Sequence, residues 1–118
     1  MKQDYLQLRV LEIAPRVFVT GQLFETDLGL AVQQGVRSIV DNRDDGESAG
    51  QPASADLAKA AEALGMAFVQ FPIDPVSISA DDVVAFRKIC AELERPLLLF
   101  SRTGRRSIKI WEMAESQD

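Results

Sequence analysis

The chain has 118 residues, of which 47% are hydrophobic and 26% charged, a composition that suits one compact domain over 1–118 and argues against disorder. Its formal net charge of −5 argues against a general nucleic-acid binder, and no apolar run is long enough to cross a membrane. One cysteine rules out an internal disulfide, and the lack of histidine rules out histidine-ligated metals and any triad or dyad with a histidine base.

The N-terminus shows no targeting signal. Met1-Lys2-Gln3-Asp4 lacks the apolar core that a signal peptide needs. We therefore expect a cytoplasmic protein without metal or cofactor, in which any catalysis uses carboxylates, arginines, hydroxyls, backbone amides or Cys90.

Strand and helix patterns alternate along the chain. In chain order the sequence predicts a weak edge strand at 8–13, a strand at 17–20, a helix at 25–34, a strand at 38–41, a helix at 54–64, a strand at 67–71, a helix following 79–82, a strand at 97–100 and a last helix beginning within 104–107. Ser54 and Ser79 are expected to cap their helices. The polar segment 44–52 predicts a mobile surface loop.

This alternation predicts an α/β fold, a three-layer sandwich in which helices flank a mostly parallel central sheet of 4–5 strands. In open sheets of this kind, ligands bind beyond the carboxyl ends of the strands. The residues expected at that edge are Gly21, Gln22, Asn42, Arg43, Asp74 and those of 101–107.

The segment 101–107 has the composition of an oxyanion-binding loop between a strand and a helix. Gly104 permits a tight turn, the following helix contributes its positive end, and the Arg106 side chain can hold two oxygens of a tetrahedral anion. The expected anion-binding residues are Arg102, Thr103, Gly104, Arg105, Arg106 and Ser107. The alternative is an ordinary strand-to-helix turn with solvated arginines.

Several segments, spread over nearly the whole chain, match one family. They are 17–22, 35–43, the Asp-Gly-Glu at 45–47, Gln51-Pro52, Phe71-Pro72-Ile73 and the Ser-Arg-Thr-Gly-Arg-Arg-Ser loop at 101–107. On these residues the chain resembles the phosphatase-like domain of bacterial β-lactamase hydrolase-like proteins, a branch of the dual-specificity and protein tyrosine phosphatase fold. The resemblance implies a phosphate-binding loop, and a bacterial setting in which such domains are sometimes fused to enzymes of sulfur metabolism or to related hydrolases.

The resemblance also implies phosphate-monoester hydrolysis through a phosphocysteine. Position 101 would hold the nucleophile, Arg106 and the loop amides would stabilise the transition state, and Asp74 would be the general acid, with Asp44 and Asp45 as alternatives. The ligand would be an oxyanion, a phosphorylated small molecule or a phosphopeptide.

Ser101 departs from this family pattern, because the family has cysteine there. A serine hydroxyl ionises far less readily than a thiol, so hydrolysis should fall by orders of magnitude. Serine at this position is typical both of an inactivated phosphatase and of a natural pseudophosphatase that binds an oxyanion and regulates a partner enzyme. A third hypothesis, a persulfide-handling domain, would also need cysteine at 101.

Other side chains have both a functional and a structural interpretation. Arg43 could contact substrate or pair with Asp44 or Glu47, and Gln22 could contact substrate or order the loop. Ser107 is expected to hydrogen-bond the group at position 101. Cys90 lies on an apolar helix face and is expected to be a buried core residue rather than a nucleophile.

Overall fold

The computed structural model describes residues 8–116, which contain one five-stranded sheet. Its strands are β1 (Leu11–Ala14), β2 (Val17–Thr20), β3 (Ser38–Asp41), β4 (Ala67–Gln70) and β5 (Leu97–Phe100), in the spatial order β1-β2-β5-β3-β4. β1 pairs antiparallel with β2, and all other neighbours pair parallel. The predicted mostly parallel sheet is confirmed, although the edge strand begins at 11 rather than 8, since its register with β2 starts there.

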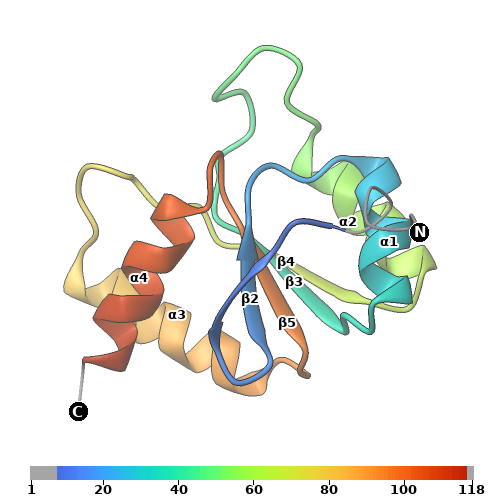
Figure 1. Cartoon of the computed structure of the whole chain (residues 1–118). Coiled ribbons are helices and arrows are strands. Elements are labelled where there is room, and N and C mark those ends of the chain that lie inside the picture. Colours follow the sequence, from blue (N-terminus) through green and yellow to red (C-terminus); the bar gives the residue numbers. More distant parts are fainter. Residues whose placement is uncertain (1–7, 117–118) are drawn as a thin grey trace.

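Four helices lie in two layers against this sheet. α1 (Glu25–Gln33) and α2 (Ser54–Ala63) cover one face, while α3 (Ala80–Glu92) and α4 (Arg105–Glu115) cover the other (Figure 1). This is the predicted three-layer α/β sandwich, and it leaves the carboxyl ends of the parallel strands at one edge.

The central strand β5 contributes side chains to both layers of the core, because successive residues of a strand point to opposite faces. Leu97 and Leu99 pack in the cluster on the α3/α4 side, and Leu98 and Phe100 pack in the cluster on the α1/α2 side. All four are fully buried, as are the residues of β3. The position at which β5 ends is therefore fixed from both faces, and so is the start of the loop that follows.

The two predicted helix caps differ in outcome. Ser79 does cap α3: its hydroxyl accepts from the Asp82 amide at 3.0 Å, and its own amide donates to the Asp82 carboxylate. The cap at Ser54 was wrong, because the cap residue is Ala53 and Ser54 is the first helical residue. The Asp45 carboxylate accepts the Ser54 amide hydrogen instead, so a side chain from the preceding loop supplies the cap.

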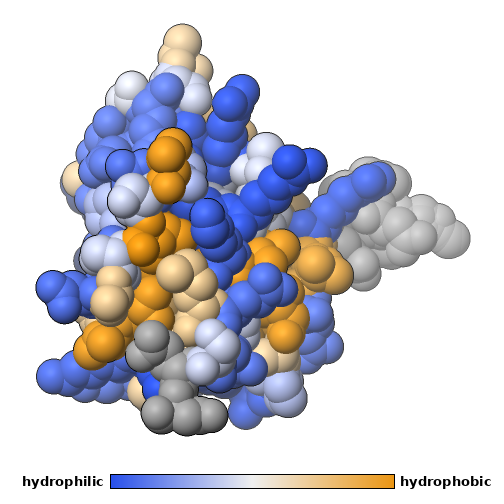
Figure 2. Space-filling model, turned by 90° about the vertical axis from the view of Figure 1, so that its left-hand side faces the viewer, coloured by the Kyte–Doolittle hydropathy of each residue, from blue (hydrophilic) through white to orange (hydrophobic). Residues whose placement is uncertain are grey.

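The face formed by α3 and α4 exposes apolar side chains between hydrophilic ones (Figure 2). Val84 of α3 is 60% exposed, and Val76 of the preceding loop is 87% exposed.

Within residues 8–116, no helix combines the length and the apolar character needed to span a bilayer.

We expect Phe86→Ala to lower the free energy of unfolding by about 3–5 kcal/mol. Phe86 is fully buried, and the rings of Phe71 and Trp111 lie edge-on to it at centroid distances of 5.7 and 6.4 Å. Val84→Ala, on the exposed face of the same helix, is the control and should change stability by less than about 0.5 kcal/mol. Urea denaturation followed by circular dichroism measures both; equal losses would contradict the assigned packing.

Candidate oxyanion-binding site

A pocket of about 340 Å³ opens at the carboxyl edge of the sheet, where β5 passes into α4. Its lining comes from the 101–107 loop, the first two turns of α4 and the loop after β4. The lining residues are Pro75, Ser101, Arg102, Thr103, Arg105, Arg106 and Lys109. The topology that the sequence predicts thus forms a pocket at the edge where ligands of such sheets bind.

Two glycines let the loop pack tightly against the end of β2. Gly104 has φ +93°, and a Cβ on it would lie 3.0 Å from Val19 Cγ1. A Cβ on Gly21 would lie 3.2 Å from the carbonyl oxygen of Arg102, which accepts a hydrogen bond from the Gln22 amide. The loop is therefore held to the neighbouring strand by backbone contacts that larger residues would disrupt.

The backbone amides of 102–106 donate to no acceptor within the described part of the chain. Those of Arg105 and Arg106 belong to the first turn of α4, whose N–H groups have no partner inside a helix. This end of the helix also has the positive end of the helix dipole. Unpaired amides at a helix N-terminus favour binding of an anion.

Arg106 is held so that one edge of its guanidinium has no protein partner. Of the five N–H groups, Nη1 uses two, toward the Asn42 carbonyl and Glu47, both at 3.0 Å, and Nη2 uses one, toward Glu47 at 3.2 Å. The Nε atom is buried and has no hydrogen-bond partner among the described residues. Nε–H and the second Nη2–H lie on the same edge of the planar group, so together they can bind two oxygens of one anion.

Glu47 fixes both Arg106 and a second arginine, Arg43. The Glu47 carboxylate accepts from Arg43 Nε at 2.8 Å, from both Arg106 terminal nitrogens and from the Asp44 amide. Partial burial would raise the pKa of Glu47, but the hydrogen bonds from Arg106, Arg43 and the Asp44 amide lower it to about 2. Glu47 is therefore ionised at neutral pH and stays paired with both guanidinium groups.

The 44–52 loop, expected to be mobile, is exposed but hydrogen-bonded to itself. The Gln51 side-chain oxygen accepts from the amides of Glu47 and Ser48, and its nitrogen donates to the Asp44 carbonyl at 2.8 Å. These contacts shape the loop around Glu47.

Ser101 lies at the base of the pocket and is buried. Its hydroxyl oxygen lies 3.3 Å from that of Ser107 and 3.4 Å from the Ser107 amide nitrogen. The Ser107 hydroxyl donates to Asn42 Oδ1 at 2.7 Å, and the Asn42 side-chain amide is oriented by donating to the Phe71 carbonyl. Because Ser107 gives its one hydroxyl hydrogen to Asn42, the Ser101 hydroxyl is the donor in the contact between the two hydroxyls, while its oxygen accepts from the Ser107 amide.

The structure separates the residues named from the sequence into two groups. Arg102, Thr103, Arg105 and Arg106 line the pocket with Ser101, whereas Gly104, Ser107, Arg43 and Gln22 do not. The Arg43 side chain is 3% exposed and donates to Glu47, Gln22 and Ser48, so the ion pair with Glu47 is present. Gln22 orders the loop through its amide and holds Arg43 with its side-chain oxygen.

Asp74 lies beside the pocket on an exposed loop, but its neighbour Pro75 is the lining residue. The Asp74 Oδ1 atom accepts from the Val76 amide at 2.9 Å, which closes a turn. Sequence reasoning named Glu47 only as a partner for Arg43 and Asn42 only as a residue of the edge, so it missed the pairing of Glu47 with Arg106 and the hydrogen bond from Ser107 to the Asn42 side chain. The Asp-Gly-Glu motif was the available signal for Glu47; nothing local marks Asn42, whose partner Ser107 is 65 residues away.

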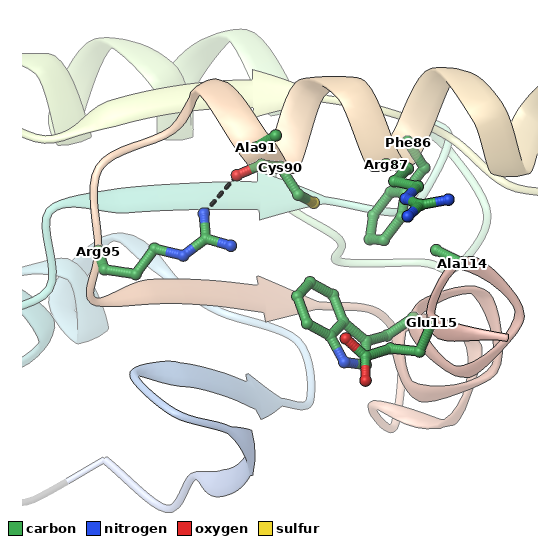
Figure 3. A pocket seen from close by; sticks show the side chains of 8 residues that line it. Phe86, Arg87, Cys90, Ala91, Arg95, Ala114 and Glu115 are labelled. Atoms are coloured by element: carbon green, nitrogen blue, oxygen red, sulfur yellow. Dashed lines mark hydrogen bonds between the residues drawn. The ribbon is translucent and has the colours of Figure 1, made fainter. Parts of the chain in front are cut away.

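A second pocket, of about 190 Å³, lies between α3 and α4 (Figure 3). It contains Cys90, which is 3% exposed, and Arg95 donates to the Cys90 carbonyl near the end of α3. Burial raises the pKa of Cys90 to about 12, against the opposing effect of Arg95. As expected, Cys90 is a core residue, and its buried thiol is unsuited to nucleophilic chemistry.

The family model for the phosphatase-like domain of β-lactamase hydrolase-like proteins matches residues 7–117. The chain belongs to this family. A β-lactamase hydrolase-like protein of Agrobacterium fabrum is 31% identical over 111 residues, covering 94% of this chain and 26% of that protein. The chain thus spans about a quarter of the length of that relative.

Solved structures of phosphatases share the fold. A Neisseria meningitidis protein named "putative phosphatase" is 29% identical with a TM-score of 0.82, covering 92% of this chain and 79% of its own. A kinase-associated phosphatase whose catalytic-site cysteine is replaced by serine has a TM-score of 0.68 at 14% identity, covering 95% and 78%. The domain is therefore phosphatase-like, with the fold of the protein tyrosine and dual-specificity phosphatases.

One buried carboxyl close to the site is not paired with a cation. Asp41, the last residue of β3, is 2% exposed and accepts from the Arg43 amide at 2.9 Å. Burial raises its pKa to about 6, opposed by hydrogen bonds from the Arg43 amide and the Ser54 side chain. For an acid with a raised pKa in the folded state, ionisation destabilises the fold as pH increases from its unfolded pKa to its folded one.

We expect Asp41→Asn to stabilise the domain by about 1–2 kcal/mol at pH 7.5 and to lose this advantage near pH 4, where the native side chain is protonated in the folded state. Thermal unfolding of both proteins across this range measures the difference. Asp44→Asn, which removes an exposed negative charge from the adjacent loop, is the matched control. A stabilisation that did not depend on pH would contradict the account.

Proposed function

We propose that this domain binds the phosphate group of a phosphate monoester in the 101–107 loop, and that with Ser101 it holds this group with little or no hydrolysis. The observation that supports this most directly is the unpaired edge of Arg106, whose buried Nε–H has no acceptor in the described protein. A buried donor without a partner costs about 1–3 kcal/mol, so an anion that accepts from it is stabilised by the same order.

The surrounding groups suit a tetrahedral dianion. Two oxygens would accept from the Arg106 edge, and the others would accept from the unpaired amides at 102–106. Glu47 already balances part of the charge of Arg106, and its end-on position leaves the side edge without an acceptor.

In a form with cysteine at position 101, we propose phosphate-monoester hydrolysis in two steps. The thiolate attacks phosphorus as the bond to the ester oxygen breaks, and Asp74 protonates the departing oxygen. Water then attacks the phosphocysteine, giving a proton back to Asp74 and releasing phosphate and the thiolate. The Arg106 edge and the loop amides stabilise the charge on the equatorial oxygens in both steps.

With Ser101 the first step lacks a route for the proton. The neighbouring acceptor is Ser107, whose own hydrogen bonds to neutral Asn42, and the chain has no histidine to act as base. A persulfide role is disfavoured for the same chain, because Ser101 cannot form a persulfide and Cys90 is buried.

The relatives are about four times as long as this chain, which supports a domain that acts beside a fused or partner enzyme. In that setting the domain would be an inactive phosphatase that regulates the enzyme by binding an oxyanion.

We expect Ser101→Cys to raise kcat/KM for an aryl phosphate by at least about 1000-fold, with an optimum below pH 7, because a thiolate is available where an alkoxide is not. Steady-state hydrolysis of p-nitrophenyl phosphate measures it. Adding Arg106→Ala should remove about 100-fold or more of that activity. A Ser101→Cys protein that folds and binds phosphate but stays inactive would favour a binding module.

Asp74 is tested in the active Ser101→Cys background. Asp74→Asn should slow phenyl phosphate, whose leaving group is poor, by about 100-fold, and should affect p-nitrophenyl phosphate much less, because a good leaving group needs no proton. Asp44→Asn and Asp45→Asn are the comparison variants, since both were alternatives for the acid. Equal losses on the two substrates would reject Asp74 as the acid.

A further inference from the structure

The pocket contains more positive charge than one bound phosphate group requires. Four cationic side chains line it: Arg102, Arg105, Arg106 and Lys109. Among the described residues only Arg106 of these four forms an ion pair, with Glu47. Three unneutralised cations therefore surround the pocket of a chain whose net charge is −5.

These three cations come from one continuous segment, the 101–107 loop and the start of α4. Arg105 and Lys109 are four residues apart on α4, so they lie on the same face of the helix, about one turn from each other. Arg102 comes from the loop before the helix. All three are exposed, so their charges are available to a ligand that extends outward from the loop.

The acidic residue nearest in sequence to the lining does not neutralise them. Asp74 precedes Pro75, but its carboxylate accepts from the Val76 amide, and the residue is absent from the lining. The other carboxylate next to the loop, Glu47, is shared by two arginines that it already pairs with.

The lining residues also argue against an aromatic ligand. Pro75 is the only apolar side chain among the lining residues, and none of them is aromatic. A phenyl ring bound through its phosphate would find no ring against which to stack. The pocket therefore favours further negative charge beyond the first phosphate over an aromatic group.

We propose that the preferred ligand is a small molecule with a second phosphate group next to the one in the loop, bound by Arg102, Arg105 and Lys109. This inference rests on the proposed function, which supplies the site for the first phosphate. The second group can be attached to a neighbouring carbon or through an anhydride, since both present the same charged oxygens to the same three side chains.

The test uses the Ser101 protein itself. Because this protein hydrolyses its ligand little or not at all, binding can be measured without turnover. Isothermal titration compares phosphate with pyrophosphate, and 3-phosphoglycerate with 2,3-bisphosphoglycerate, each pair differing by one phosphate. We expect the second phosphate to increase affinity at least about tenfold, and phosphotyrosine to bind no more tightly than phosphate. The two pairs distinguish an anhydride from a carbon-linked phosphate, and a gain in either pair supports the proposal.

The double variant Arg105→Ala/Lys109→Ala should reduce this ratio of affinities to near one, with Lys59→Ala/Lys88→Ala, two exposed lysines on other helices, as the matched control that keeps it. Arg105→Gln/Lys109→Gln replaces the alanine variant if the latter unfolds. Equal affinities within both pairs, a ratio unchanged by the double variant, or tighter binding of phosphotyrosine than of 2,3-bisphosphoglycerate would overturn the proposal. If no phosphate compound bound, the proposed function would fail as well.

Discussion

The site depends on one carboxylate, Glu47, which pairs with two arginines at once. Through Arg43 it is connected to the end of β3, and through Arg106 to the first turn of α4, so one side chain links the 44–52 loop to the 101–107 loop. Because the contact with Arg106 uses the terminal nitrogens, the guanidinium is oriented before any ligand arrives, with Nε–H and one Nη2–H on its unpaired edge. An arginine held in this way loses little conformational entropy on binding, which favours affinity for an anion.

The rest of the molecule provides the rigid frame for this arrangement. β5 is buried on both faces, and it ends where Gly104 brings the loop within van der Waals contact of β2. Beneath the loop, a series of hydrogen bonds from Ser101 through Ser107 to Asn42 connects position 101 to the end of β3. These hydrogen bonds explain why anion binding and phosphate-ester hydrolysis at the site are separable. They accommodate a neutral hydroxyl at position 101 while giving that hydroxyl no base.

Much of this architecture could be predicted from the sequence. The four strands with strongly apolar patterns, the capping box at Ser79 and the turn from β5 into α4 all depend on residues close together in the chain. Two of the features that escaped prediction depend on long-range contacts. The pairing of Glu47 with Arg106, 59 residues away, and the role of Asn42 arise only once the strands are side by side. The Asp45 cap of α2 is a local contact that depends on how the 44–52 loop folds back to the helix. The polar composition of the exposed loop at 44–52 does not reveal that its side chains hydrogen-bond to its own backbone.

The central claim is that Glu47 holds Arg106 with its Nε edge facing a bound oxyanion. The most direct measurement is a crystal structure of the Ser101 protein with tungstate, a tetrahedral dianion whose position is established by anomalous scattering. The account predicts the ion within hydrogen-bonding distance of Arg106 Nε and of the amides of 102–106, with the Glu47–Arg106 pair intact. An ion held elsewhere, or one that binds only after Arg106 has left Glu47, would contradict it.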